Sequence, residues 1–109
     1  MAYSEDLAVR VRRALAIRAD VTERKMFGGL AFMLRGNMCC GVSGDMLMLR
    51  LGKEGAAEAL KEPHVNPMDF TGKILKSMVY VRSEGVATLE DLIRWVNRGA
   101  DFAATLPPK

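Results

Sequence analysis

Three short apolar stretches separated by tight-turn signals lie between residues 25 and 51, and this pattern constrains the fold more than any other. Residues 25–34, 38–43 and 46–51 are rich in strand-forming side chains. The sequences RGN at 35–37 and GD at 44–45 are typical of turns. Connections this short join neighbouring antiparallel strands, so we expect a three-stranded meander.

Helical patterns flank this apolar block. Residues 4–18 place apolar side chains at helical spacing, and Ser4 is a natural N-cap. Residues 53–61 predict a short second helix, and a capping box that begins at Thr88 opens a third helix that ends near residue 105. The side chains expected to face the core are Leu7, Val11, Ala14 and Leu15 in the first helix and Leu89, Leu92, Ile93, Val96, Ala100 and Ala103 in the third.

Between the second and third helices the pattern changes. Two prolines in residues 62–67 predict a loop, because proline is excluded from a helix interior and from a central strand. Residues 78–82 predict a further strand, and residues 74–76 either extend it or pair separately. Strands that are grouped rather than alternating with helices indicate an α+β fold, with an antiparallel sheet and flanking N- and C-terminal helices. We expect one domain over residues 1–109, with an ordered core over residues 4–105.

Charge and hydropathy exclude several classes of protein. The chain has 16 Lys and Arg residues and 13 Asp and Glu residues, which leaves a modest net charge of +3. No apolar stretch approaches the ~20 residues that a transmembrane helix needs. The N-terminus carries acids where a secretory signal peptide has basic residues, so we expect a cytoplasmic protein that does not bind membranes. Two cysteines are too few for the disulfide framework of small secreted proteins.

The densest basic cluster lies in the first predicted helix, where it suggests nucleic-acid binding. The candidate residues are Arg10, Arg12 and Arg13, together with Lys25 after the helix. Acidic side chains are interleaved with them, whereas nucleic-acid-binding proteins gather basic residues on one face. We therefore expect no direct contact with nucleic acid and keep weak nucleic-acid binding as an alternative.

Gly28 and Gly29 interrupt the strand pattern of residues 25–34. Glycine inside a strand is typical of a bulge or a close backbone approach, and close packing of a helix against the sheet is the better explanation. A phosphate-binding loop would need a helix after the glycines, with Lys and Ser or Thr following. Apolar strand-forming residues follow instead, so a phosphate site is not indicated.

Cys39 and Cys40 are adjacent in the second predicted strand. Because side chains alternate between the faces of a strand, we expect the two thiols to point in opposite directions, one buried and the other accessible. Two such thiols cannot hold one metal ion, and His64 is the single histidine. We expect no metal, no cofactor and no catalytic residue; a catalytic cysteine with His64 as its base stays an alternative.

The last predicted helix carries a second apolar face, rotated from its core stripe. Trp95, Gly99, Phe102 and Leu106 recur at helical spacing along it. One interpretation is that the helix is wedged between the sheet and the first helix, so that both faces are covered. The other is a partner-binding or dimer surface, because Trp and Phe are common anchors of interfaces. Gly99 would then let a second helix approach closely.

The stretch KMFGGLAF at residues 25–32, followed by GNM at 36–38, resembles the TfoX/Sxy family. More narrowly, it is similar to the N-terminal domain of those bacterial competence regulators. The signature residues are Met26, Phe27, Gly28 and Gly29, and the resemblance extends over residues 4–105.

This resemblance implies an α+β domain similar to YjbR-like and secretion-chaperone-like folds, and it supplies no catalytic residues. Regulators of the family carry a second, C-terminal domain and act as transcriptional co-activators through protein partners. We therefore expect a stand-alone N-terminal domain that works as a non-enzymatic protein-interaction module, accessory to transcription, through a protein partner or self-association. The alternative is an enzyme or small-ligand binder, which would need a pocket where Cys39 or Cys40 meets His64, Tyr80 or an arginine.

Overall fold

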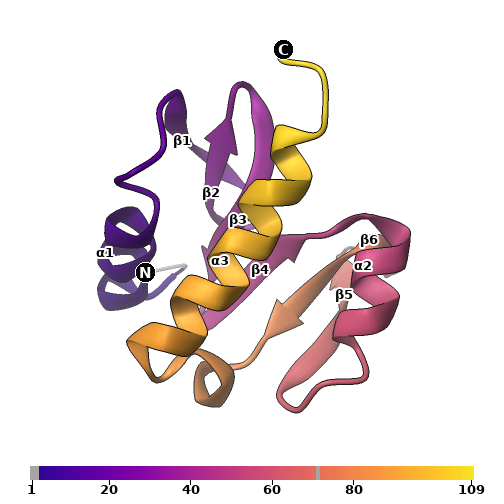
Figure 1. Ribbon diagram of the computed structural model, residues 1–109. Coiled ribbons are helices and arrows are strands. Elements are labelled where there is room, and N and C mark those ends of the chain that lie inside the picture. Colours follow the sequence, from indigo (N-terminus) through magenta and orange to yellow (C-terminus); the bar gives the residue numbers. More distant parts are fainter. Residues whose placement is uncertain (1–2, 71) are drawn as a thin grey trace.

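One antiparallel sheet of six strands organises the computed structural model, which describes residues 3–70 and 72–109 (Figure 1). The elements in chain order are α1 (Glu5–Ala14), β1 (Val21–Met26), β2 (Gly29–Leu34), β3 (Asn37–Ser43), β4 (Met46–Arg50), α2 (Gly52–Ala59), β5 (Val65–Phe70), β6 (Lys73–Val81), the 3-10 helix η1 (Ser83–Val86) and α3 (Leu89–Ala104). The strand order across the sheet is β1-β2-β3-β4-β6-β5. The predicted α+β fold with an antiparallel sheet and flanking helices is confirmed.

The predicted strand over residues 25–34 is wrong in one respect, because it is two strands. Met26 and Gly29 pair across a hairpin whose two loop residues are Phe27 and Gly28. Both have positive φ angles, 54° and 72°, as a tight turn matching the twist of the strands requires. Gly28 is therefore a turn residue rather than part of a bulge, and the meander begins one strand earlier than expected.

The predicted loop over residues 62–67 is also partly wrong, since β5 begins at Val65. Pro67 is tolerated in β5 because this strand pairs only with β6 and forms the edge of the sheet. Residues 74–76 lie within β6, which is one continuous strand. Of the two arrangements expected for them, extension of the later strand is the one found.

Two helices differ in detail from the prediction. Helix α1 ends at Ala14, four residues before the expected end. In α3 the expected core stripe is shifted around the helix, because Leu89 and Ile93 are 60% and 38% exposed while Trp95 is 1% exposed. None of the helices within residues 3–70 and 72–109 is long and apolar enough to cross a membrane.

The three α-helices cover one face of the sheet, and α3 lies diagonally across it between α1 and α2 (Figure 1). Helix α3 packs on β3 and β4, and α1 packs against α3. Side chains from all three helices join one face of the strands in a single apolar core. This helix-side core contains both cysteines and Trp95.

The opposite face of the sheet carries a second apolar cluster that is rich in methionine. Its buried members are Ala31, Met33, Met38, Met48, Met68 and Met78. Met26, Phe27 and Leu75 pack against this cluster and also line one cavity of about 290 Å³. In a flat sheet, β1 and β6 would be about 19 Å apart, at ~4.8 Å for each strand spacing. The sheet therefore curls around the methionine cluster and buries it without any helix.

Candidate functional site

An apolar groove between α2 and β6 is the candidate functional site. It has a volume of about 330 Å³. The lining residues are Lys53, Ala57, Leu60, Pro67, Ile74, Leu75, Lys76 and Met78. We call this surface the α2–β6 groove.

Helix α2 is held beside the groove by its position directly after β4. Gly52, the first residue of α2, has a φ of +77°, and it lies against the ring of Phe102. Ala56 and Ala59 face the helix-side core, which leaves Ala57 and Leu60 to line the groove. The short alanine-rich face brings α2 close to the sheet, so the longer Leu60 side chain forms one wall.

The groove opens where the pairing between β4 and β6 ends. The last pair in the register is Arg50 with Met78, and the Leu51 amide then donates to the Ser77 carbonyl at 2.9 Å. Earlier residues of β6 extend beyond β4 and pair with β5 alone. The neighbour of β6 on this side is therefore a helix, and the gap between them is lined by side chains.

Two features of the α2–β6 groove distinguish it from ordinary surface. Leu60 and Ile74, on opposite walls, are 41% and 64% exposed, which is unusual for large apolar side chains that lie together. The charged side chains among its lining residues are Lys53 and Lys76, both cationic. The site is thus an apolar trough with two positive charges and no carboxylate in its wall.

A second cavity lies beside the first half of β6 and shares Leu75 and Met78 with the groove. It has a volume of about 290 Å³ and leads to the methionine cluster. Its remaining lining residues are Met26, Phe27, Met38, Arg50 and Ser77. Methionine adapts its shape readily, so this side of β6 can repack when a group enters the groove.

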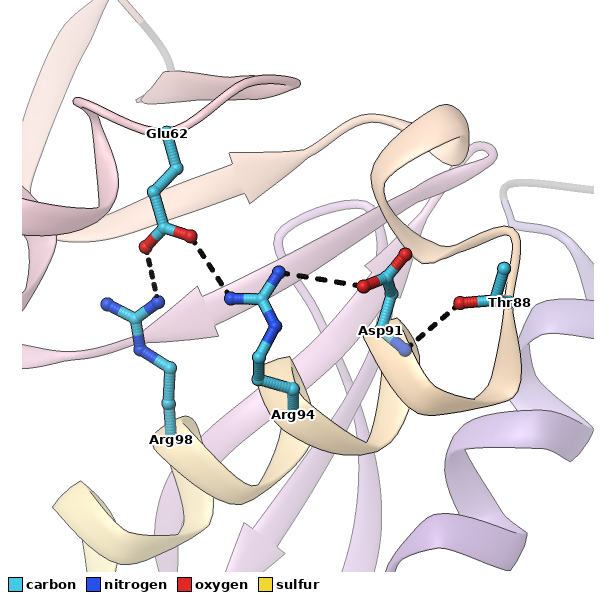
Figure 2. Close-up of polar contacts among 5 residues, drawn as sticks. All are labelled: Glu62, Thr88, Asp91, Arg94 and Arg98. Carbon is cyan, nitrogen blue, oxygen red and sulfur yellow. Dashed lines mark hydrogen bonds and ion pairs between the residues drawn. The ribbon is translucent and has the colours of Figure 1, made fainter.

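Two arginines lie over the ring of Trp95, and they belong to the ion-pair network drawn in Figure 2. The guanidinium carbons of Arg94 and Arg98 lie 4.7 and 4.4 Å from the centre of the Trp95 ring. Glu62 holds both arginines, with N–O distances of 3.0 Å to Arg94 and 2.7 Å to Arg98. Arg94 also lies 3.7 Å from Asp91. The two arginines therefore form a cover over the indole that is fixed by a carboxylate from the loop after α2.

The network shifts the acid–base equilibrium of Glu62. Burial raises the pKa of this carboxyl, but the hydrogen bonds from Arg98 and Arg94 outweigh burial, and the net pKa is lowered. Glu62 is therefore ionised at neutral pH, and its charge is matched by the two arginines.

At the start of α3, Thr88 caps the helix by accepting a hydrogen bond of 3.1 Å from the Asp91 amide (Figure 2).

The second apolar face predicted on α3 is not a free surface. Trp95 lies in the helix-side core, and a Cβ on Gly99 would collide with the carbonyl oxygen of Cys39. Phe102 and Leu106 are half-buried, and the Phe102 ring contacts Gly52. The first of the two interpretations of this face, a helix with both sides covered, agrees with these contacts. Gly99 admits a strand rather than a second helix.

Cys39 and Cys40 are both fully buried in the same core, which contradicts the expectation of opposite faces. The register explains the difference: Phe32 pairs with Cys40 and Met33 with Met38, so Cys39 is an extra residue in a β-bulge. The bulge breaks the alternation and places the two sulfurs 3.8 Å apart. The neighbouring Cys39 thiol and burial both raise the pKa of Cys40, which keeps it protonated.

Within residues 3–70 and 72–109, the two cysteines do not meet Tyr80 or His64 in one pocket. Both cysteines face the helices, whereas Tyr80 packs against the methionine cluster on the other side of the sheet. His64 lies beside Gly85, at the start of β5. Among the described residues, no group of three or more His, Cys, Asp or Glu side chains is placed to hold a metal ion.

The predicted basic patch is divided by the fold. Arg10 donates hydrogen bonds of 2.6 and 3.3 Å to the carbonyl oxygens of Val86 and Ala87. Arg12 pairs with Glu23 on β1, at 2.5 and 2.9 Å. Arg13 and Lys25 are exposed. Two of the four basic side chains thus serve to join elements of the domain, and the patch is not a continuous set of free cations.

The glycine signature has a structural role that differs from the expected one. A Cβ on Gly29 would collide with the carbonyl oxygen of Val42, so β2 and β3 approach closely at this point. The close approach was expected, but the partner is a neighbouring strand rather than a helix. Met26 and Phe27 pack on the methionine cluster. The four signature residues therefore form the β1–β2 hairpin and cover part of that cluster.

The residues of the α2–β6 groove were not identified from the sequence. Leu60 follows Ala56 by four residues, so helical spacing places it on the side of the buried alanines and gives no signal of an exposed groove residue. The other wall has no signal either, because Ile74 in β6 is exposed only where β4 has ended. That condition depends on how two strands align, which local patterns do not reveal.

Comparison with protein families identifies the family of this domain. The family model of the TfoX N-terminal domain matches residues 13–103 of the 109-residue chain. The matched region begins within α1 and ends within α3, so it includes every strand of the sheet. No curated protein matches the chain.

Proposed function

This chain belongs to the TfoX N-terminal domain family, and from that membership we propose that it is a small non-enzymatic protein-interaction module that contributes to transcriptional regulation. The resemblance to competence regulators supports a role exerted through protein partners. The α2–β6 groove is the surface that we assign to the interaction.

The observation that supports this proposal is the exposure of Leu60 and Ile74 on facing walls of one groove. Leaving a large apolar side chain in water costs about 1.5–3 kcal/mol relative to its full burial. Exposed apolar side chains that share a groove mark interaction sites more often than isolated ones do. Contact with a partner would bury both side chains at once.

Site-specific photocrosslinking in the native host tests this proposal. A benzoylphenylalanine residue at position 74 samples the groove, and one at position 17 samples a highly exposed position outside the groove lining, since Ile17 is 88% exposed. We expect a discrete protein adduct from position 74 and none of the same mass from position 17. Mass spectrometry of the adduct should identify a component of the transcription machinery.

A second variant separates specific docking from chance contact. Leu60→Glu places a charge on the opposite wall of the groove without altering the crosslinker, and we expect it to abolish the adduct at position 74. An adduct that survives Leu60→Glu, or that forms equally from both positions, would contradict docking in the groove. An adduct with a protein unrelated to transcription would contradict the regulatory part of the proposal.

A further inference from the structure

We propose that the α2–β6 groove binds an acidic amphipathic segment of a partner protein. Apolar side chains of the segment would enter between Leu60 and Ile74, and its carboxylates would pair with Lys53 and Lys76. This inference rests on the proposed function and specifies the chemistry of the partner that the groove accepts.

The first argument is the state of the two lysines. Within the described part of the chain, neither Lys53 nor Lys76 has an ion pair or a side-chain hydrogen bond. Nearby cations are already matched: Lys61 lies 3.3 Å from Glu58, and Glu62 is shared by Arg94 and Arg98. The cations of the groove are thus available to an acidic partner.

The second argument concerns the type of ligand. Small-molecule sites fix their ligands with a few convergent polar groups in an apolar pocket. The α2–β6 groove has no hydroxyl, amide or carboxylate side chain among its lining residues, and its two lysines are flexible and exposed. Such a surface recognises an apolar stripe with negative charge at its margins, which is how an amphipathic helix enters a groove.

The third argument disfavours a second copy of this chain as the occupant. A symmetric dimer would bring the same surface of each copy together and would therefore place both pairs of lysines in one interface. The chain carries a net charge of +3, so two copies also repel each other as a whole. An acidic segment of another protein has neither disadvantage.

Two matched synthetic peptides provide the test. Both are about 18 residues long, or five helical turns, with the same leucine stripe, and they carry either Glu or Lys at the remaining charged positions. Binding is measured by fluorescence anisotropy at low salt, and the contact surface is located by methyl NMR of Leu60, Ile74 and Met78. We expect the Glu peptide to bind and the Lys peptide to bind at least about tenfold more weakly.

Two double variants of equal net charge provide the control. Lys53→Glu with Lys76→Glu reverses the charge of the groove, whereas Arg13→Glu with Arg24→Glu makes the same change at exposed positions outside its lining. We expect the first variant to weaken the Glu peptide by about tenfold and the second to weaken it by less than about threefold. Circular dichroism confirms that both variants remain folded.

Three results would overturn the inference. They are failure of the Glu peptide to bind below about 1 mM, equal binding of both peptides, and equal effects of the two double variants. Tighter binding of decanoate or of anionic phospholipid vesicles, with the same methyl shifts, would also overturn it, in favour of a small amphipathic anion or a membrane surface. If position 74 still crosslinks its native partner while the acidic preference is absent, the proposed function stands and this inference falls.

Discussion

Gly99 of α3 lies directly against the carbonyl group of Cys39 in β3, with no room between them for a Cβ atom. The Cβ of alanine at this position would also lie 3.2 Å from the Leu49 side chain. This contact sets the distance between α3 and the centre of the sheet. It also explains why a glycine persists in the middle of a long helix, where it costs about 1 kcal/mol relative to alanine.

Gly99→Ala should destabilise the protein although alanine favours the helix. The Cβ meets backbone rather than a flexible side chain, so α3 must move away from β3, and overpacking of this kind costs about 1–3 kcal/mol. Urea denaturation followed by circular dichroism measures the change. Gly55→Ala in α2 is the control, because its nearest neighbour is the Leu51 Cβ at 3.0 Å and the cost should be much smaller. Equal stability of Gly99→Ala and the native chain would contradict the packing described for α3.

Removing the charge of Glu62 should loosen the cover over Trp95. In Glu62→Gln the two arginines lose their shared carboxylate, and because these ion pairs are partly exposed we expect a loss of only about 1 kcal/mol. The tryptophan emission should shift to longer wavelength as water reaches the ring. Arg13→Gln, which changes an exposed side chain outside the network, should alter neither quantity. An unchanged emission spectrum in Glu62→Gln would show that the cover does not depend on the carboxylate.

The stabilisation from Glu62 should depend on pH in one direction. Its folded pKa lies below the usual value of about 4.3, so its ion pairs stabilise the fold above that pH and lose their effect as the pH falls through the folded pKa. The difference in unfolding free energy between the native chain and Glu62→Gln should be constant near neutral pH and should decline as the pH falls below the usual glutamate pKa and through the lowered pKa of folded Glu62. Urea titrations across this range provide the measurement. A difference that grows on acidification would contradict the assignment.

Both thiols should be inert in the folded protein. Cys39 and Cys40 are fully buried, so a thiol reagent such as dithionitrobenzoate should label neither without unfolding and both in denaturant. The labelling rate in native buffer then reports how often the core opens. Gly99→Ala should accelerate it, because this substitution moves α3 away from Cys39. Rapid labelling of one thiol in the native chain would instead support the accessible cysteine expected from strand alternation.

Two arginines of α1 should behave differently when truncated. Arg10→Ala removes the hydrogen bonds to the Val86 and Ala87 carbonyls and should cost about 1–2 kcal/mol. Arg13→Ala removes an exposed side chain and should change stability by less than about 0.5 kcal/mol. Thermal denaturation of the two variants checks this difference. Equal effects would mean that the contact of Arg10 with the end of η1 contributes nothing.

Part of the fold follows from the sequence because the information is local. The turns after β2 and β3 are marked by their glycines, and the N-caps of α1 and α3 are marked by Ser4 and Thr88. The hairpin at Phe27 also contains a glycine, Gly28, but its first loop residue is a phenylalanine, which rarely adopts a positive φ, and its neighbours have the pattern of a strand. The buried side of α3 differs from the predicted one for a similar reason. Both apolar sides of this helix satisfy helical spacing, and only the element that packs against the helix determines which side is buried.

The sequence by itself determined the α+β class, the meander, the flanking helices and the family. Each of these depends on periodicity, on turn chemistry or on a contiguous motif. Only the tertiary structure decided that Cys39 and Cys40 lie together, that Trp95 is covered and that Leu60 and Ile74 face each other across a groove. A bulge, an ion-pair cover and the end of strand pairing are relations between different segments of the chain. Their geometry is set when the sheet forms its register, so no local pattern of residues can specify it.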